Sequence, residues 1–87
     1  VRTSELDELV RAAAARNVEE GHQKLIAALA HARHQRFAEA LQCLAGVPED
    51  VEPIRRAQLL GQAYDRLGDA SAAFASYTRM NDLVAED

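Results

Sequence analysis

Residues that favour α-helices dominate this chain, and residues that interrupt helices are few. Its 87 residues include only 4 Gly and 2 Pro, and alanine runs such as residues 12–15 are strong helix formers. No stretch alternates apolar and polar side chains as a half-buried strand does. The sequence therefore predicts an all-α fold.

Apolar residues at helical spacing divide the chain into five expected helices. Asn17 is expected to close the first helix in a left-handed turn, and Gly46 and Pro48 are expected to stop the third. Pro53 suits the first turn of the fourth helix, and Gly68 is expected to end it. The expected ranges are 5–16, 18–34, 37–44, 53–67 and 69–84.

Bulk composition limits the classes of partner. The net charge is −4, with 10 Lys and Arg against 14 Asp and Glu, and the basic residues form no cluster that suits nucleic acid. No apolar run approaches the roughly 20 residues that span a bilayer, and residues 1–5 do not resemble a signal peptide. The single cysteine, Cys43, has apolar neighbours that predict a packed thiol. We expect a cytoplasmic protein, bacterial in type, with no membrane or nucleic-acid partner.

Two parts of the sequence are related by an offset of 33 residues. Residues 35–40 align with residues 68–73 at this offset, and Leu44 aligns with Tyr77. His31 likewise aligns with Tyr64. Two helix–turn–helix units at such an offset are typical of a solenoid, in which successive units stack.

The second unit carries small and aromatic residues at regular spacings. Small Gly61 and Ala73 let two helices approach closely, and Gly68 suits the turn between them. The full set is Leu60, Gly61, Tyr64, Gly68, Ala73 and Tyr77. At these spacings the unit resembles a tetratricopeptide repeat, although Ala57 stands where that family often has tryptophan.

The resemblance covers residues 19–84 and implies a right-handed helical-hairpin solenoid. The first unit departs from the pattern, because Gln35 replaces the turn glycine and His31 replaces the aromatic residue. The expected organisation is one domain over residues 1–87, with a flanking helix (1–17), a first repeat (18–50) and a second repeat (51–87). The flanking helix is expected either to belong to an earlier repeat or to cap the face of Leu25 and Leu29.

A narrower resemblance concerns the end of the chain. Residues 67–69, 73–77 and 80–81 are similar to the last repeat before the catalytic domain of bacterial tetratricopeptide-repeat sulfotransferase proteins. This resemblance implies that the chain is the non-catalytic region of a larger enzyme, since its 87 residues include no phosphate-binding loop.

No residue pattern predicts catalysis or metal binding. His31 and His34 share a helix face, but a structural zinc site uses four ligands, usually with several cysteines, and Cys43 is alone. Ser4, Ser71 and Ser76 lie in expected helical or capping positions, without a strained turn that would present a nucleophile. We therefore expect no enzyme activity, no cofactor and no metal.

The family resemblance implies a concave groove lined by the first helix of each hairpin. Arg55 and Arg66 would hold a peptide backbone or carboxylate by forked hydrogen bonds. In the alternative interpretation, the first helix covers Leu25 and Leu29 and the polar residues are only solvated. The groove candidates are His22, Leu25, Leu29, Arg33, Arg55, Gln58, Gln62, Asp65 and Arg66.

These features predict a protein-interaction or scaffold module that binds a peptide, a helix or an adjoining domain. Two alternatives stay open. The chain is the accessory repeat region of a larger enzyme such as a sulfotransferase, or it is a homo-oligomerisation element that dimerises through uncapped repeat ends. The sequence does not identify the protein or peptide partner.

Overall fold

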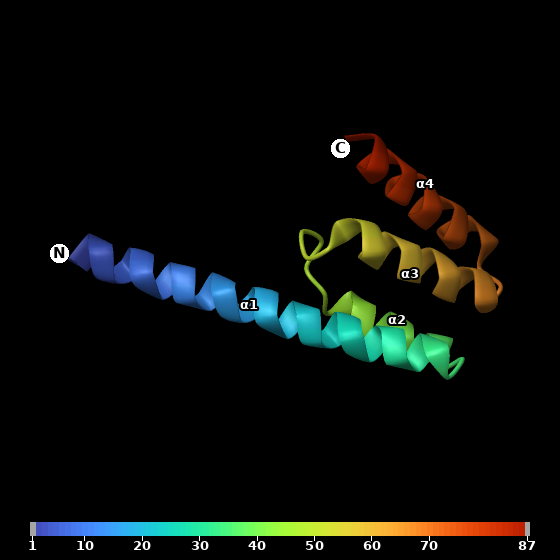
Figure 1. The fold of residues 1–87 in the computed structure, drawn as a ribbon, viewed down its shortest axis with the longest axis horizontal. Helices are drawn as coiled ribbons and strands as arrows, with labels where there is room; N and C mark the ends of the chain where they lie inside the picture. Colours follow the sequence, from blue (N-terminus) through green and yellow to red (C-terminus); the bar gives the residue numbers. More distant parts are fainter. Residues whose placement is uncertain (1, 87) are drawn as a thin grey trace.

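The structure is a computed structural model that describes the backbone of residues 2–86 and the side chains of residues 5–86. This part of the chain is all-helical, as predicted, and contains α1 (Arg2–Arg33), α2 (Phe37–Ala45), α3 (Pro53–Arg66) and α4 (Ala70–Glu86). Helices α1 and α2 form one antiparallel pair and α3 and α4 form another, and α1 and α3 run in the same direction (Figure 1).

The described residues form four helices, where the sequence predicted five. Helix α1 continues unbroken through Asn17, so the helix ends expected at residues 16 and 18 are wrong. Asparagine costs a helix only about 0.6 kcal/mol relative to alanine, and α1 continues through Gly21, one turn later, as well. The predicted boundary between flanking helix and first repeat therefore falls inside one helix.

The other helices lie within two residues of their expected bounds, and their turns share one backbone feature. Gly68, in the turn between α3 and α4, has a φ of 86°. Gln35, in the turn between α1 and α2, has a φ of 61°. These residues are aligned by the 33-residue offset, so both turns place a left-handed residue at the same position of the unit.

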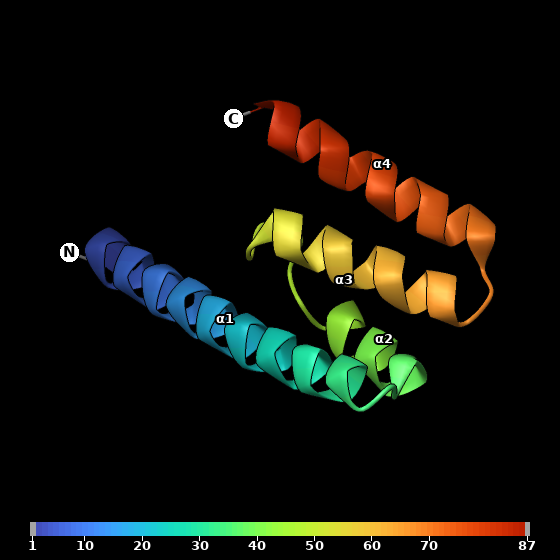
Figure 2. The ribbon, with the colours of Figure 1, turned by 45° about the vertical axis from the view of Figure 1, so that its right-hand side comes forward.

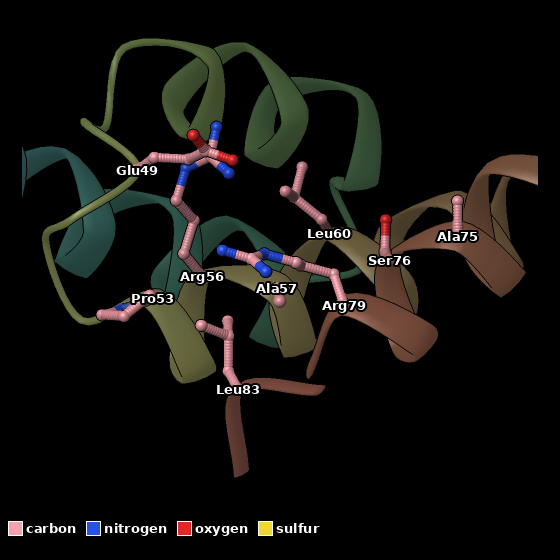
Figure 3. Close-up of a pocket in the computed structure, with 9 residues that line it drawn as sticks. All are labelled: Glu49, Pro53, Arg56, Ala57, Leu60, Ala75, Ser76, Arg79 and Leu83. Carbon is pink, nitrogen blue, oxygen red and sulfur yellow. The ribbon is translucent and has the colours of Figure 1, made fainter. Parts of the chain in front are cut away.

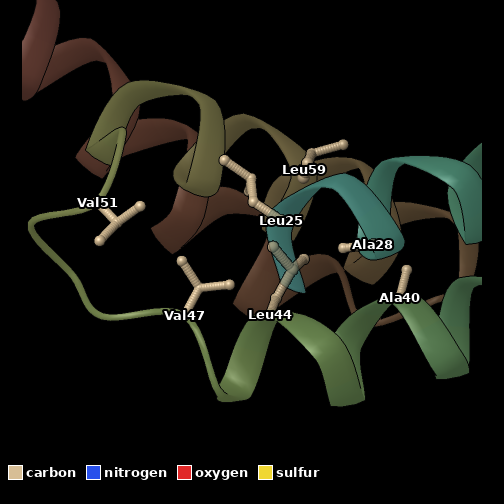
Figure 4. Packing of buried hydrophobic residues seen from close by; sticks show 7 residues of the cluster. All are labelled: Leu25, Ala28, Ala40, Leu44, Val47, Val51 and Leu59. Atoms are coloured by element: carbon tan, nitrogen blue, oxygen red, sulfur yellow. The ribbon is translucent and has the colours of Figure 1, made fainter. Parts of the chain in front are cut away.

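The main core lies where the second half of α1 meets α2, α3 and the 46–52 loop (Figure 4). Leu25 of α1 and Leu44 of α2 are 3% and 0% exposed. Val47 and Val51 bring the loop into the same cluster, and Leu59 joins it from α3. Each such side chain contributes about 1.5–3 kcal/mol by burial, so this cluster holds the two helix pairs together.

Helices α3 and α4 approach closely at Gly61. A Cβ atom there would lie 2.7 Å from Cε1 of Tyr77, which is too short for an ordinary carbon contact. Ala73 of α4 is also buried, at 5% exposure. The close approach predicted at Gly61 is therefore confirmed, because only a hydrogen at this position leaves room for the tyrosine ring.

The first half of α1 extends past the three other helices (Figures 1 and 2). Residues 5–20 are all exposed, and Leu6, Leu9 and Val10 are 61%, 64% and 67% exposed. Of the two alternatives expected for this segment, a cap on the face of Leu25 and Leu29 is wrong. An unbroken helix cannot fold back on itself, and Leu25 packs instead with residues from α2, α3 and the 46–52 loop.

Candidate functional site

The four groove candidates on α1 do not form one exposed surface. Leu25 belongs to the core, and Leu29 is half-buried against it. His22 is exposed, and its Nδ1 atom lies 3.4 Å from Oε2 of Glu52 at the start of α3. Arg33 is exposed at the end of the helix. The α1 side of the predicted groove is therefore partly filled by the protein's own packing.

The groove candidates on α3 are exposed but separate into two regions. Arg55 and Gln58 line a shallow depression of about 360 Å³ at the start of the helix. Arg66 lies at the other end, where its guanidinium carbon is 6.0 Å from the centre of the Phe37 ring, a cation–π distance. The exposed candidates are Arg55, Gln58, Gln62, Asp65 and Arg66. The structure thus brings Arg55 and Gln58 together and places Arg66 elsewhere.

Another cleft lies between α3, α4 and the 46–52 loop, with a volume of about 190 Å³ (Figure 3). Its charged residues come from three segments: Arg56 from α3, Arg79 from α4 and Glu49 from the loop. Leu60 and Leu83 supply part of an apolar lining. The cleft combines two guanidinium groups with a single carboxylate beside an apolar surface.

Arg56 is the best anchored charged residue of the cleft. Its Nε atom donates a hydrogen bond of 3.1 Å to the carbonyl oxygen of Val47. This bond fixes the loop against α3, and it leaves the two terminal nitrogens of the guanidinium for other acceptors. Among the residues that the structure describes, the guanidinium of Arg79 makes no hydrogen bond or ion pair.

The hydroxyl of Ser76 is already engaged inside α4. It donates to the carbonyl oxygen of Ala72 at 2.9 Å, one helical turn earlier. Its proton therefore satisfies the helix backbone, and only its oxygen lone pairs face other groups. A ligand at this cleft would have its charge matched by the arginines.

Sequence patterns do not reveal this cleft, because its residues are distant in the chain. Arg56 lies one helical turn before Leu60, and Arg79 lies one turn before Leu83. That spacing could have shown that each arginine adjoins an apolar stripe of its helix. Only the packing of α3 on α4 shows that both arginines border the same space.

Comparisons with protein-family profiles, curated proteins and solved structures found no match. The resemblance to tetratricopeptide repeats, and to the repeats of sulfotransferase proteins, therefore stays a prediction.

Within residues 2–86, no helix combines the length and apolarity needed to cross a bilayer. The same residues contain no group of three or more His, Cys, Asp or Glu side chains placed to hold a metal ion.

Proposed function

We propose that this chain is a non-catalytic interaction module and that the first half of α1 is its main docking surface. The observation that carries this proposal is the exposed stripe formed by Leu6, Leu9 and Val10. Their i, i+3, i+4 spacing puts them on one helix face. Packing against another polypeptide would remove this apolar stripe from water, which stabilises a complex.

The partner that fits this stripe is an amphipathic helix with basic flanks. Glu5 and Asp7 precede and follow Leu6, so they project to opposite flanks of the stripe. Residues 5–20 hold five Asp or Glu and two Arg, so their net charge is −3. Lys and Arg beside an apolar seam would complement this surface and set the orientation of the partner.

In the proposed module, the two helix pairs stack as tetratricopeptide hairpins do. Three features support this arrangement: the pairing of α1 with α2 and of α3 with α4, the contact of α3 with both helices of the first pair, and the left-handed residue at both turns. Stacked hairpins bury one another's apolar faces, which agrees with a core shared by α1, α2 and α3.

The test uses a labelled synthetic helix with a leucine stripe and lysine flanks, and measures its binding by fluorescence anisotropy. The double variant Leu9→Asn, Val10→Asn should weaken binding about tenfold or more, because each buried aliphatic side chain contributes about 1.5–3 kcal/mol. Leu67→Asn is the matched control. Leu67 is 50% exposed in the turn after α3, remote from this stripe, so its replacement should leave the affinity unchanged.

Two outcomes would change the proposal. Equal binding of a peptide with glutamate flanks, or an affinity unaffected by the double variant, would reject this surface as the site for a basic-flanked helix. A dimer that forms at micromolar concentration and is abolished by the double variant, measured by sedimentation, would replace the partner helix with a second copy of this chain.

A further inference from the structure

We infer that the cleft between α3 and α4 binds a single carboxylate, carried on the side chain of an acidic residue of a polypeptide partner. The inference rests on the placement of Arg56 and Arg79 in one cleft of about 190 Å³. Figure 3 shows the Arg79 side chain extending from α4 across the cleft, toward the side that carries Arg56. The site is distinct from the exposed stripe of α1.

Guanidinium groups suit this ligand because their planar fork matches the two oxygens of a carboxylate. Arg56 has its Nε bound to the Val47 carbonyl, so its position is fixed before a ligand arrives and its terminal nitrogens remain to donate. Arg79 has no partner among the described residues and can turn toward the same anion. Together they offer one anchored donor group and one adjustable donor group.

The charge of the cleft favours a monoanion over a phosphate dianion. Arg56 and Arg79 contribute two positive charges and Glu49 contributes one negative charge, so the lining carries a net charge of +1. A bound carboxylate brings the site to neutrality, whereas a phosphate dianion leaves a net negative charge. Excluding water from a site costs less free energy when the bound site has no net charge.

The apolar lining distinguishes an acidic side chain from a free small anion. Leu60 and Leu83 border the cleft beside the arginines, and Ala57 is buried below them at 4% exposure. The methylene groups of a glutamate would contact these carbons while its carboxylate reaches the guanidinium groups. A volume of about 190 Å³ corresponds to roughly six waters, which is the scale of one side chain.

Glu49 makes the affinity of the site adjustable. It lies on the 46–52 loop and lines the same cleft, so its carboxylate competes with a ligand for the positive charge. Its removal should therefore strengthen binding, whereas the loss of either arginine should weaken it. Opposite effects from residues in one cleft are the signature of an electrostatic site.

The probe is N-acetyl-glutamic acid N-methylamide, whose side-chain carboxylate is its only charge, titrated while amide chemical shifts are recorded by NMR. We expect saturable shifts around Arg56, Ser76 and Arg79. Arg79→Gln should weaken binding about tenfold, as expected for a lost charge-assisted hydrogen bond. Glu49→Gln should strengthen it roughly threefold. Arg79 makes no hydrogen bond or ion pair with the described residues, so Arg79→Gln keeps the test valid if Arg56→Gln loosens the loop.

Arg55→Gln is the matched control, because it removes the same charge one residue away on the exposed face of α3. The Arg55→Gln variant should bind the probe with the same affinity as the unmodified protein. The inference is overturned if Arg55→Gln weakens binding as much as Arg79→Gln, if the glutamine analogue of the probe binds equally well, or if the shifts do not saturate. Tighter binding of inorganic phosphate at this cleft would overturn the assignment to a carboxylate.

The inference depends on the proposed function in one respect, namely that the carboxylate belongs to a polypeptide. The small probe tests the cleft with the α1 stripe intact. Loss of helix binding in the Leu9→Asn, Val10→Asn variant tests the stripe with the cleft intact. Failure of either site is therefore recognised separately.

Discussion

The turn residues Gln35 and Gly68 occupy aligned positions and adopt the same left-handed conformation, but only one of them is suited to it. Gly68 has no Cβ atom, and nothing lies within 4 Å of the place where one would stand. For Gln35, the left-handed region costs roughly 1–2 kcal/mol. The packing of α1 against α2 must therefore offset this cost.

Replacing Gln35 by glycine should raise the free energy of unfolding by about 0.5 kcal/mol. The substitution removes the left-handed cost of roughly 1–2 kcal/mol, and part of this gain is lost because glycine makes the unfolded chain more flexible. Urea unfolding followed by circular dichroism measures the change.

Gln42→Gly serves as the control, because Gln42 is exposed inside α2 and glycine there should lower stability by about 1 kcal/mol. The two Gln→Gly variants should therefore shift stability in opposite directions. A loss of stability at both positions would contradict the strain assigned to Gln35.

At the scale of elements, the distance between α3 and α4 depends on one glycine. Gly61 lies in the middle of α3, where glycine costs about 1 kcal/mol relative to alanine. The ring of Tyr77 occupies the space that a Cβ atom would need. The helix therefore accepts a poor helix former because the packing of α4 requires it.

Gly61→Ala should lower the free energy of unfolding by about 1–2 kcal/mol, because overpacking outweighs the better helix propensity. In a Tyr77→Ala background, the same substitution should be neutral or stabilising, since the space beside α3 is then open. Thermal unfolding of the two single variants and the double variant gives the coupling energy between the two positions.

Gln62→Ala, on the exposed face of α3, should change stability by less than about 0.5 kcal/mol and is the control. Equal effects of Gly61→Ala with and without Tyr77 would show that the ring is not the cause.

The whole molecule is elongated, and its stability is unevenly distributed. It measures 54 × 29 × 17 Å, and its radius of gyration of 15.5 Å exceeds the value of about 12 Å for a compact domain of this length. The first half of α1 accounts for the length and is exposed throughout (Figure 1). Helical segments of this size are only marginally stable without tertiary contacts.

Amide hydrogen exchange should therefore be much faster in residues 5–17 than in residues 24–33 of the same helix. The second segment is protected by the core that contains Leu25 and Ala28, whereas the first has only its own helix propensity. Mass spectrometry of peptic fragments measures both segments in one sample.

Addition of the lysine-flanked helix should slow exchange in residues 5–17 and leave residues 24–33 almost unchanged. Equal protection of the two segments in dilute protein alone would contradict the gradient and would indicate self-association along α1.

Sequence patterns were sufficient for the class of fold and for most helix ends. The end of α2, both ends of α3 and the start of α4 followed from Gly46, Pro48, Pro53 and Gly68, because these residues act on the backbone locally. The break expected at Asn17 was wrong, since asparagine only weakly disfavours a helix. The 33-residue offset also placed the two turns at equivalent positions.

The candidate sites were less predictable. The sequence placed Leu25 in a groove, but its burial depends on the 46–52 loop and α2, which are distant in the chain. Arg55 and Arg56 cannot be distinguished by residue type. Only their position around α3 decides that Arg55 faces solvent and that Arg56 lines a cleft with Arg79.

The sequence by itself determined that this protein is helical and located the turns at residues 34–36, 46–52 and 67–69, because propensity and turn conformation are properties of neighbouring residues. The tertiary structure decided which apolar stripe is buried and which remains exposed. It also decided which arginines meet, because such contacts depend on how whole helices pack against one another.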